Sequence, residues 1–188
     1  MSTASQFKAF VERQQRSTTA EDSPDWTKER DEWLDQLREL YERIDGFLSE
    51  YVESSTIELR KSTVELNEEY IGAYTATRLT IVIGAQEIVL TPIGTLLIGS
   101  KGRVDVEGSA GNSRLVLIDR NITHSRQLMR VTASTMGPDG NWTASSEPPA
   151  PRQKIEWTWK IVSRPPTMQF IELNKDTFFE MLMEVSNG

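Results

Sequence analysis

The strongest hydrophobic pattern lies in the first third of the chain. Between residues 24 and 52 the apolar side chains recur at alternating steps of four and three residues: Leu37, Tyr41, Ile44, Leu48 and Tyr51. That spacing places them on one face of an α-helix. The preceding Ser23-Pro24-Asp25 supplies a capping serine, a proline suited to the first turn, and a negative charge for the positive end of the helix. We therefore predict one long amphipathic helix over residues 24–52.

After residue 52 the pattern changes to β-branched residues with period-two alternation, which is typical of strands. The predicted strands are 56–60, 63–67, 70–83, 87–91, 94–98, 102–107, 113–119, 127–132, 154–163 and 167–173. Short glycine-containing segments separate many of them, at 84–86, 99–102 and 108–112. Such connections are too short for a crossover helix, so the strands should pair antiparallel.

The end of the chain carries a second helical pattern. Phe178, Leu182 and Val185 follow steps of four and three residues after Asn174, so this helix should dock on the sheet. The sequence thus predicts an α+β fold: an antiparallel β-sheet or partly open barrel, with a long N-terminal amphipathic helix and a short C-terminal helix.

The same patterns divide the chain into three parts that form one domain overall. Residues 1–23 are polar and should be partly flexible, residues 24–52 form the amphipathic helix, and residues 53–188 form the β domain closed by the C-terminal helix. Within that domain, residues 133–153 are rich in proline and glycine, which is typical of a long loop.

Charge and composition narrow the possible roles. The net charge of −7 opposes nucleic-acid binding, which normally needs a basic face. The absence of cysteine excludes disulfides and thiolate chemistry. No apolar segment is long enough to cross a bilayer and no leader pattern is present, so we expect a cytoplasmic protein that does not contact membranes.

Few residues suggest chemistry. Asp105 and Glu107 share a strand face and Asp119 follows on a neighbouring strand, an arrangement that could serve a hydrolase or simply form the wet side of a sheet. The single histidine, His124, fits an exposed loop, and Gly99-Ser100-Lys101-Gly102 lacks the spacing of a phosphate-binding loop. We therefore assign no catalytic, cofactor-binding or metal-binding residue and expect no cofactor.

The broad apolar face of the long helix gives the leading functional hypothesis. Such a face must be buried, so we expect a non-enzymatic module for protein interaction or self-assembly, in which helix 24–52 contacts a protein partner or a second copy. The residues expected in that contact are Trp33, Leu37, Tyr41, Ile44, Leu48 and Tyr51. Packing of the helix on its own β domain is an equal alternative, and binding of a small apolar ligand or hydrolysis by the acidic residues are the others.

Overall fold

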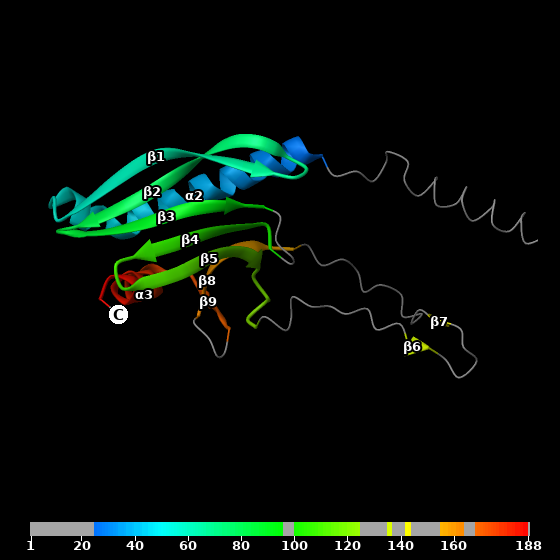
Figure 1. Cartoon of the computed structure of the whole chain (residues 1–188). Coiled ribbons are helices and arrows are strands. Elements are labelled where there is room, and N and C mark those ends of the chain that lie inside the picture. Colours follow the sequence, from blue (N-terminus) through cyan, green and yellow to red (C-terminus); the bar gives the residue numbers. More distant parts are fainter. Residues whose placement is uncertain are drawn as a thin grey trace, which may run out of the picture.

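The computed structural model describes residues 25–95, 100–124, 135–136, 142–143, 155–163 and 168–187. It has the predicted α+β architecture: helices α2 (Trp26–Glu53) and α3 (Lys175–Asn187) share one hydrophobic core with an open antiparallel sheet of seven strands (Figure 1). The strands are β1 (Ile57–Glu68), β2 (Gly72–Ile83), β3 (Gln86–Gly94), β4 (Gly102–Gly108), β5 (Gly111–Asp119), β8 (Trp157–Val162) and β9 (Phe170–Glu172). A separate pair joins β6 (Thr135–Met136) to β7 (Trp142–Thr143).

The main sheet is a meander. Its spatial order, β1-β2-β3-β4-β5-β8-β9, follows the chain, and every neighbouring pair is antiparallel. Two of the short connections are two-residue turns, at Gly84-Ala85 and Ser109-Ala110. The predicted glycine-containing turns at 84–86 and 108–112 therefore do join antiparallel strands, and the first and last strands remain separate edges.

Several predicted strands have different limits. The two predicted strands at 56–60 and 63–67 form the single strand β1, and the prediction at 87–91 extends to Gly94 in β3. Strand β8 starts at Trp157, which leaves Ile155 exposed. The strand predicted at 127–132 lies outside the described residues.

Helix α2 begins two residues later than predicted because Asp25 is its cap. The Asp25 carboxylate accepts hydrogen bonds from the backbone nitrogens of Thr27 and Lys28, each at 3.1 Å. Gly46 lies inside the helix, and no atom would come within 4 Å of a Cβ placed there. A glycine inside a helix often marks the close approach of another backbone, but the space around Gly46 shows no such approach.

Both helices cover the same face of the sheet. Trp33 lies against Gly102 and Trp159, with its ring centroid 5.9 Å from that of Trp159, and Phe47 of α2 meets Phe178 of α3 at 5.8 Å. The C-terminal helix buries all three residues of its predicted stripe, which confirms that it docks.

Among the described residues, the opposite face of the sheet has a small second cluster of buried side chains, formed by Val116, Ile118 and Phe170. Lys160 lies on this face and is 4% exposed, although a lysine that alternates with the core residues Trp159 and Ile161 would ordinarily face solvent. Its Nζ donates to the carbonyl oxygens of Arg120 and Ile122, each at 2.7 Å, so the segment after β5 covers it.

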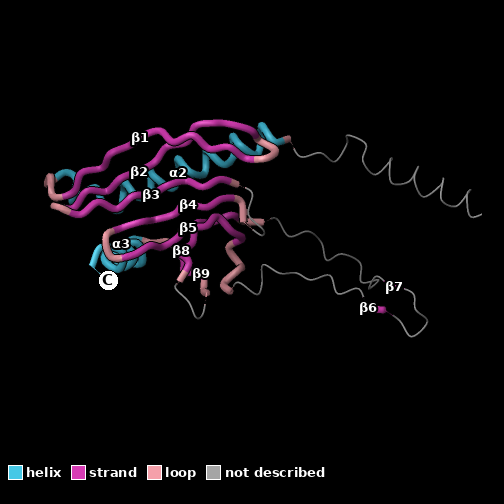
Figure 2. Tube along the Cα trace, in the orientation of Figure 1, coloured by secondary structure: helices cyan, strands magenta, loops and turns pink. Residues whose placement is uncertain are grey.

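The hairpin of β1 and β2 leaves the sheet halfway along its length. β2 pairs with β3 only from Leu79 to Ile83, whereas β1 and β2 stay paired over the whole of both strands. The outer half lies over α2: the Tyr41 hydroxyl donates to the Thr77 carbonyl at 2.7 Å, and Tyr70 at the hairpin tip stacks on Trp26 at 5.0 Å. Figure 2 shows the hairpin tip beside the first turn of α2.

Candidate functional site

The predicted interaction face of α2 lies almost wholly inside the protein. Trp33, Leu37, Tyr41, Ile44 and Leu48 are each at most 4% exposed and belong to the core that α2 shares with the sheet and α3. Burial raises the pKa of the Tyr41 phenol above its ordinary value of 10.0. Tyr51 is the exception, being 39% exposed with its ring edge-on to Phe179. In this arrangement the chain's own sheet covers the stripe.

The three acidic candidates do not meet. Asp105 and Glu107 share one face of β4 as predicted, but Arg103 donates to both carboxylate oxygens of Asp105, at 2.6 and 2.7 Å. Side chains at every second residue of a strand point to the same face, so Asp119 shares the face of Leu115 and Leu117, which point toward the helices. Asp105 and Glu107 point to the opposite face. The Asp119 carboxylate accepts from the backbone nitrogen of Asn121 at 2.9 Å. In the part of the chain that the structure describes, no three acidic or histidine side chains gather to hold a metal ion.

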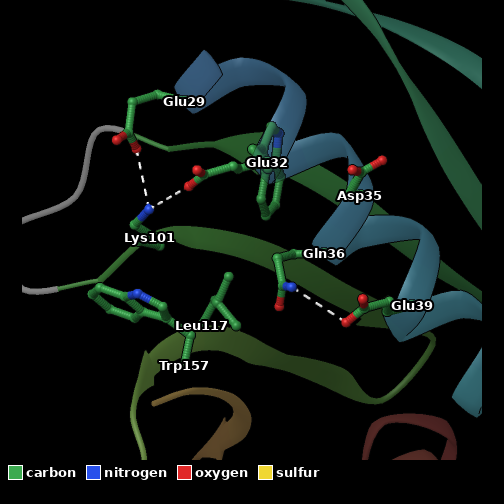
Figure 3. Close-up of a pocket in the computed structure, with 9 residues that line it drawn as sticks. Glu29, Glu32, Asp35, Gln36, Glu39, Lys101, Leu117 and Trp157 are labelled. Atoms are coloured by element: carbon green, nitrogen blue, oxygen red, sulfur yellow. Dashed lines mark hydrogen bonds and ion pairs between the residues drawn. The ribbon is translucent and has the colours of Figure 1, made fainter. Parts of the chain in front are cut away.

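A small acidic cavity lies between the first turns of α2 and the sheet (Figure 3). Its volume is about 240 Å³, which is below the range of roughly 300 to 1,000 Å³ usual for small-molecule sites. Four carboxylates line it, together with two tryptophans, Gln36, Lys101 and Leu117; the carboxylates are Glu29, Glu32, Asp35 and Glu39.

Each of those carboxylates already has a protein partner. Lys101 contacts Glu32 at 2.7 Å and Glu29 at 3.4 Å, and its Nζ lies 5.5 Å from the centre of the Trp157 ring. Asp35 pairs with Arg38, and Glu39 accepts from Gln36. The hydrogen bond from Lys101 lowers the pKa of Glu32. Burial alone would lower the pKa of Lys101, but the hydrogen bond to Glu32 and the two negative charges raise it overall. The ion pairs of Lys101 with Glu29 and Glu32 therefore hold the start of α2 against the residue that precedes β4.

A larger cleft of about 570 Å³ runs between α2 and the outer half of the β1–β2 hairpin. One wall is the side of α2 that carries Leu34, Arg38 and Glu42, and the other is formed by β1 and β2, including Lys61 and Thr63. The salt bridge from Lys61 to Asp45, at 2.9 Å, joins the two walls. This cleft lies directly beside the outer strand of the sheet.

The two edges of the sheet differ. At β9, Phe170 donates its backbone nitrogen to the Thr123 carbonyl at 3.0 Å, and His124 forms a bridge with Gln169, so residues 122–124 cover that short edge. At β1, all twelve residues pair with β2, and no other backbone group of the described residues bonds to the strand. Figure 1 shows β1 along the outer margin of the sheet.

The free edge is long, regular and accessible. Its pairing with β2 has no register shift, it contains no proline, and Ile57 alone among its residues is buried. A strand of this kind presents alternate unpaired N–H and C=O groups, which is the usual template for pairing with another chain. The sequence did not identify this edge, because the adjacent charges Arg60-Lys61 interrupt the alternation and split the predicted strand. Which strand lies at an edge depends on the order of the strands in the sheet, and the hydrophobic pattern within a single strand does not reveal that order.

The described part of the chain contains no helix long and apolar enough to cross a membrane. Comparisons with protein-family models, with curated protein sequences and with solved structures found no match to this chain. The β1 edge, with the cleft beside it, is therefore identified as the candidate site from its geometry alone.

Proposed function

We propose that this chain is a non-enzymatic protein-interaction module, and that β1 accepts an extended strand of another polypeptide. The observation that carries the proposal is the contrast between the edges: β9 is covered by residues 122–124, whereas β1 presents twelve residues of regular strand. Strand addition of this kind gains affinity from backbone hydrogen bonds, each contributing about 0.5 to 1.5 kcal/mol net, and specificity from alternate side chains.

The edge is a better contact than the apolar stripe of α2. To expose that stripe the protein would have to pull side chains such as Trp33 and Leu37 out of the core, where they are at most 2% exposed. Losing the burial of even one such large side chain costs about 2 to 5 kcal/mol. A partner on β1 meets backbone groups that already face outward.

The state of the acidic side chains supports a binding role over a hydrolytic one. Asp105 is held by Arg103, and Glu32 is held by Lys101 in its charged form. A general acid at neutral pH needs a carboxyl group whose pKa is raised. For Glu32 the shift is in the opposite direction.

Adjacent proline substitutions test the proposal. Because outward-facing amides alternate along β1, one of Ser62→Pro and Thr63→Pro removes an edge donor and the other breaks a bond to β2. The variant whose unfolding temperature stays closer to that of the parent protein is the edge-blocked one.

Both proteins are then screened against a displayed library of random peptides as long as β1. Peptides that bind the parent should lose roughly two- to twelvefold in affinity for the edge-blocked variant, since one lost hydrogen bond is worth about 0.5 to 1.5 kcal/mol. Glu107→Lys, on the open sheet face away from the edge, is the control and should bind as the parent does. The proposal fails if the library yields no peptide that binds, or only peptides whose affinity is the same for the parent and the edge-blocked variant.

A further inference from the structure

The charges along β1 identify what pairs with it. We infer that the occupant of the edge is a second copy of this chain, joined antiparallel about a two-fold axis at Thr63; this inference rests on the proposed function. The exposed charges change sign along the strand, from Arg60 and Lys61 in the first half to Glu65 in the second.

That reversal favours antiparallel self-pairing. An antiparallel copy lays the positive half of one strand against the negative half of the other, whereas a parallel copy sets like charges side by side. Opposite charges directly across two strands stabilise the pair and like charges weaken it, by about 0.2 to 1 kcal/mol each in either direction. Glu58 does not follow the trend, but Arg60 neutralises it within the strand, at 2.8 Å.

Backbone geometry limits the possible registers. The outward-facing groups of one strand belong to alternate residues, so a strand that pairs with its own copy must match residues of the same parity. Residues i and j that face each other then have an even sum, so the two-fold axis passes beside a single residue that faces its own copy. Near the middle of β1 the axis residue must be Ser62, Thr63 or Val64.

The axis at Thr63 is the one that pairs the free charges. It sets Lys61 opposite Glu65 of the partner subunit, and by symmetry repeats this pair on the other side of the axis. Glu65 is exposed and has no ion pair within the described residues. Lys61 is half-exposed beside Asp45, so its ammonium group can contact a second carboxylate.

The neighbouring registers are poorer. An axis at Ser62 sets Lys61 opposite Thr63 of the partner subunit and Leu59 opposite its Glu65, so no ion pair lies directly across. An axis at Val64 would use Glu68 opposite Arg60, but Glu68 already accepts from the hydroxyl of Tyr74 and from the backbone nitrogen and hydroxyl of Thr95, the latter two at 2.9 Å. The Thr63 axis also sets Glu58 opposite Glu68 of the partner subunit, but each of these carboxylates has a partner within its own subunit: Arg60 pairs with Glu58 at 2.8 Å, and Tyr74 and Thr95 donate to Glu68. Thr63 is therefore the axis that pairs the remaining charges across the edge.

A cysteine scan tests the register directly, because the parent chain has no cysteine. Under mild oxidation Thr63→Cys should form a disulfide dimer, since residues directly opposite across two strands lie within the Cα separation that a disulfide spans. Val64→Cys is the matched control: its two copies are offset along the strands and should cross-link no faster than Asn112→Cys, an exposed position far from the edge.

Sedimentation equilibrium of the full chain tests the charge pairing without any cross-link. The parent protein should dimerise reversibly as its concentration is raised, and Glu65→Lys should weaken that dimer about tenfold or more, because it turns both ion pairs into repulsions. Glu107→Lys makes the same charge change away from the edge and should leave the dimer unchanged.

The results separate this inference from the broader proposal. A chain that stays monomeric at all concentrations, or that cross-links through Val64→Cys as fast as through Thr63→Cys, overturns the Thr63 dimer. If library peptides still bind the β1 edge in that case, the proposal that the chain is a strand-binding module is kept, and only the assignment of a second copy as its partner is wrong. If the outward-facing amides of β1, those that do not donate to β2, are protected from exchange in a monomer, another segment of the same chain covers the edge and both proposals fall.

Discussion

Gly102 sets how closely the largest core side chain approaches the sheet. A Cβ at this position would lie 2.1 Å from Cζ3 and 2.4 Å from Cε3 of Trp33, well inside van der Waals contact. The Trp33 ring therefore occupies the space that any other residue would fill with its own side chain. This contact connects the first turns of α2 to β4 and holds the acidic cavity of Figure 3 in shape.

We predict that Gly102→Ala lowers the free energy of unfolding by about 1 to 3 kcal/mol, because the added methyl group forces Trp33 from its position. Urea denaturation followed by tryptophan fluorescence measures the loss. Gly46→Ala is the matched control: its Cβ meets no atom within 4 Å and lies on the exposed side of α2. That variant should be as stable as the parent or more stable by up to about 1 kcal/mol. Equal destabilisation by the two substitutions would contradict the packing described.

At the scale of elements, the outer half of the β1–β2 hairpin is held by side-chain contacts with α2 and by the hydrogen bonds from Thr95 to Glu68, and not by strand pairing with β3. Tyr41 donates to the Thr77 carbonyl, Lys61 pairs with Asp45, and Tyr70 stacks on Trp26. The hairpin is thus supported from beneath along its length. These contacts place the outer half of the hairpin beside α2.

Tyr41→Phe should loosen that support. The variant keeps the buried ring but loses the hydroxyl bond to Thr77, which we expect to cost about 0.5 to 1.5 kcal/mol. Amide exchange by mass spectrometry should show faster exchange in residues 72–78 than in the parent, while β4 and β5 are unchanged. Uniformly faster exchange across the sheet would show instead that the bond stabilises the whole fold and not the hairpin.

The elements also show how far the sequence could predict this structure. Both described helices were predicted because their apolar residues keep a regular period and lie on one buried face, as in Leu37, Ile44 and Val185. β1 was split in two because edge exposure allows Arg60 and Lys61 where a buried strand would need apolar residues. The burial of Lys160 could not be predicted, since nothing in its own strand reveals that the carbonyl groups of Arg120 and Ile122 lie over it. The candidate site depends on strand order, and therefore on tertiary structure.

At the scale of the whole molecule, Lys160 links stability to pH. Burial lowers its pKa below the ordinary value of 10.5, although the negative charges of Glu172 and Asp119 partly oppose this. The folded protein therefore releases this proton at a lower pH than the unfolded chain does. Between the two pKa values the unfolded state binds more protons, so this group adds stability as the pH rises and removes it as the pH falls.

We predict that the difference in unfolding free energy between the parent and Lys160→Met widens in favour of the parent as the pH rises from neutral toward 10.5. Urea titrations of both proteins over that range measure it. Taking the difference cancels the contribution of Tyr41, whose raised pKa acts in the opposite direction near its ordinary value of 10.0. A difference that stays constant with pH would show that Lys160 does not titrate differently in the folded state.

The covered edge at β9 has a consequence for the size of any assembly. Two copies joined through β1 would form one continuous sheet, and each outer end of that sheet would be a β9 strand whose start is already bonded to Thr123 and His124. Neither end could recruit a third copy by the same backbone bonds, so growth would terminate at two subunits. The short segment after β5 would thus protect the molecule from forming fibres.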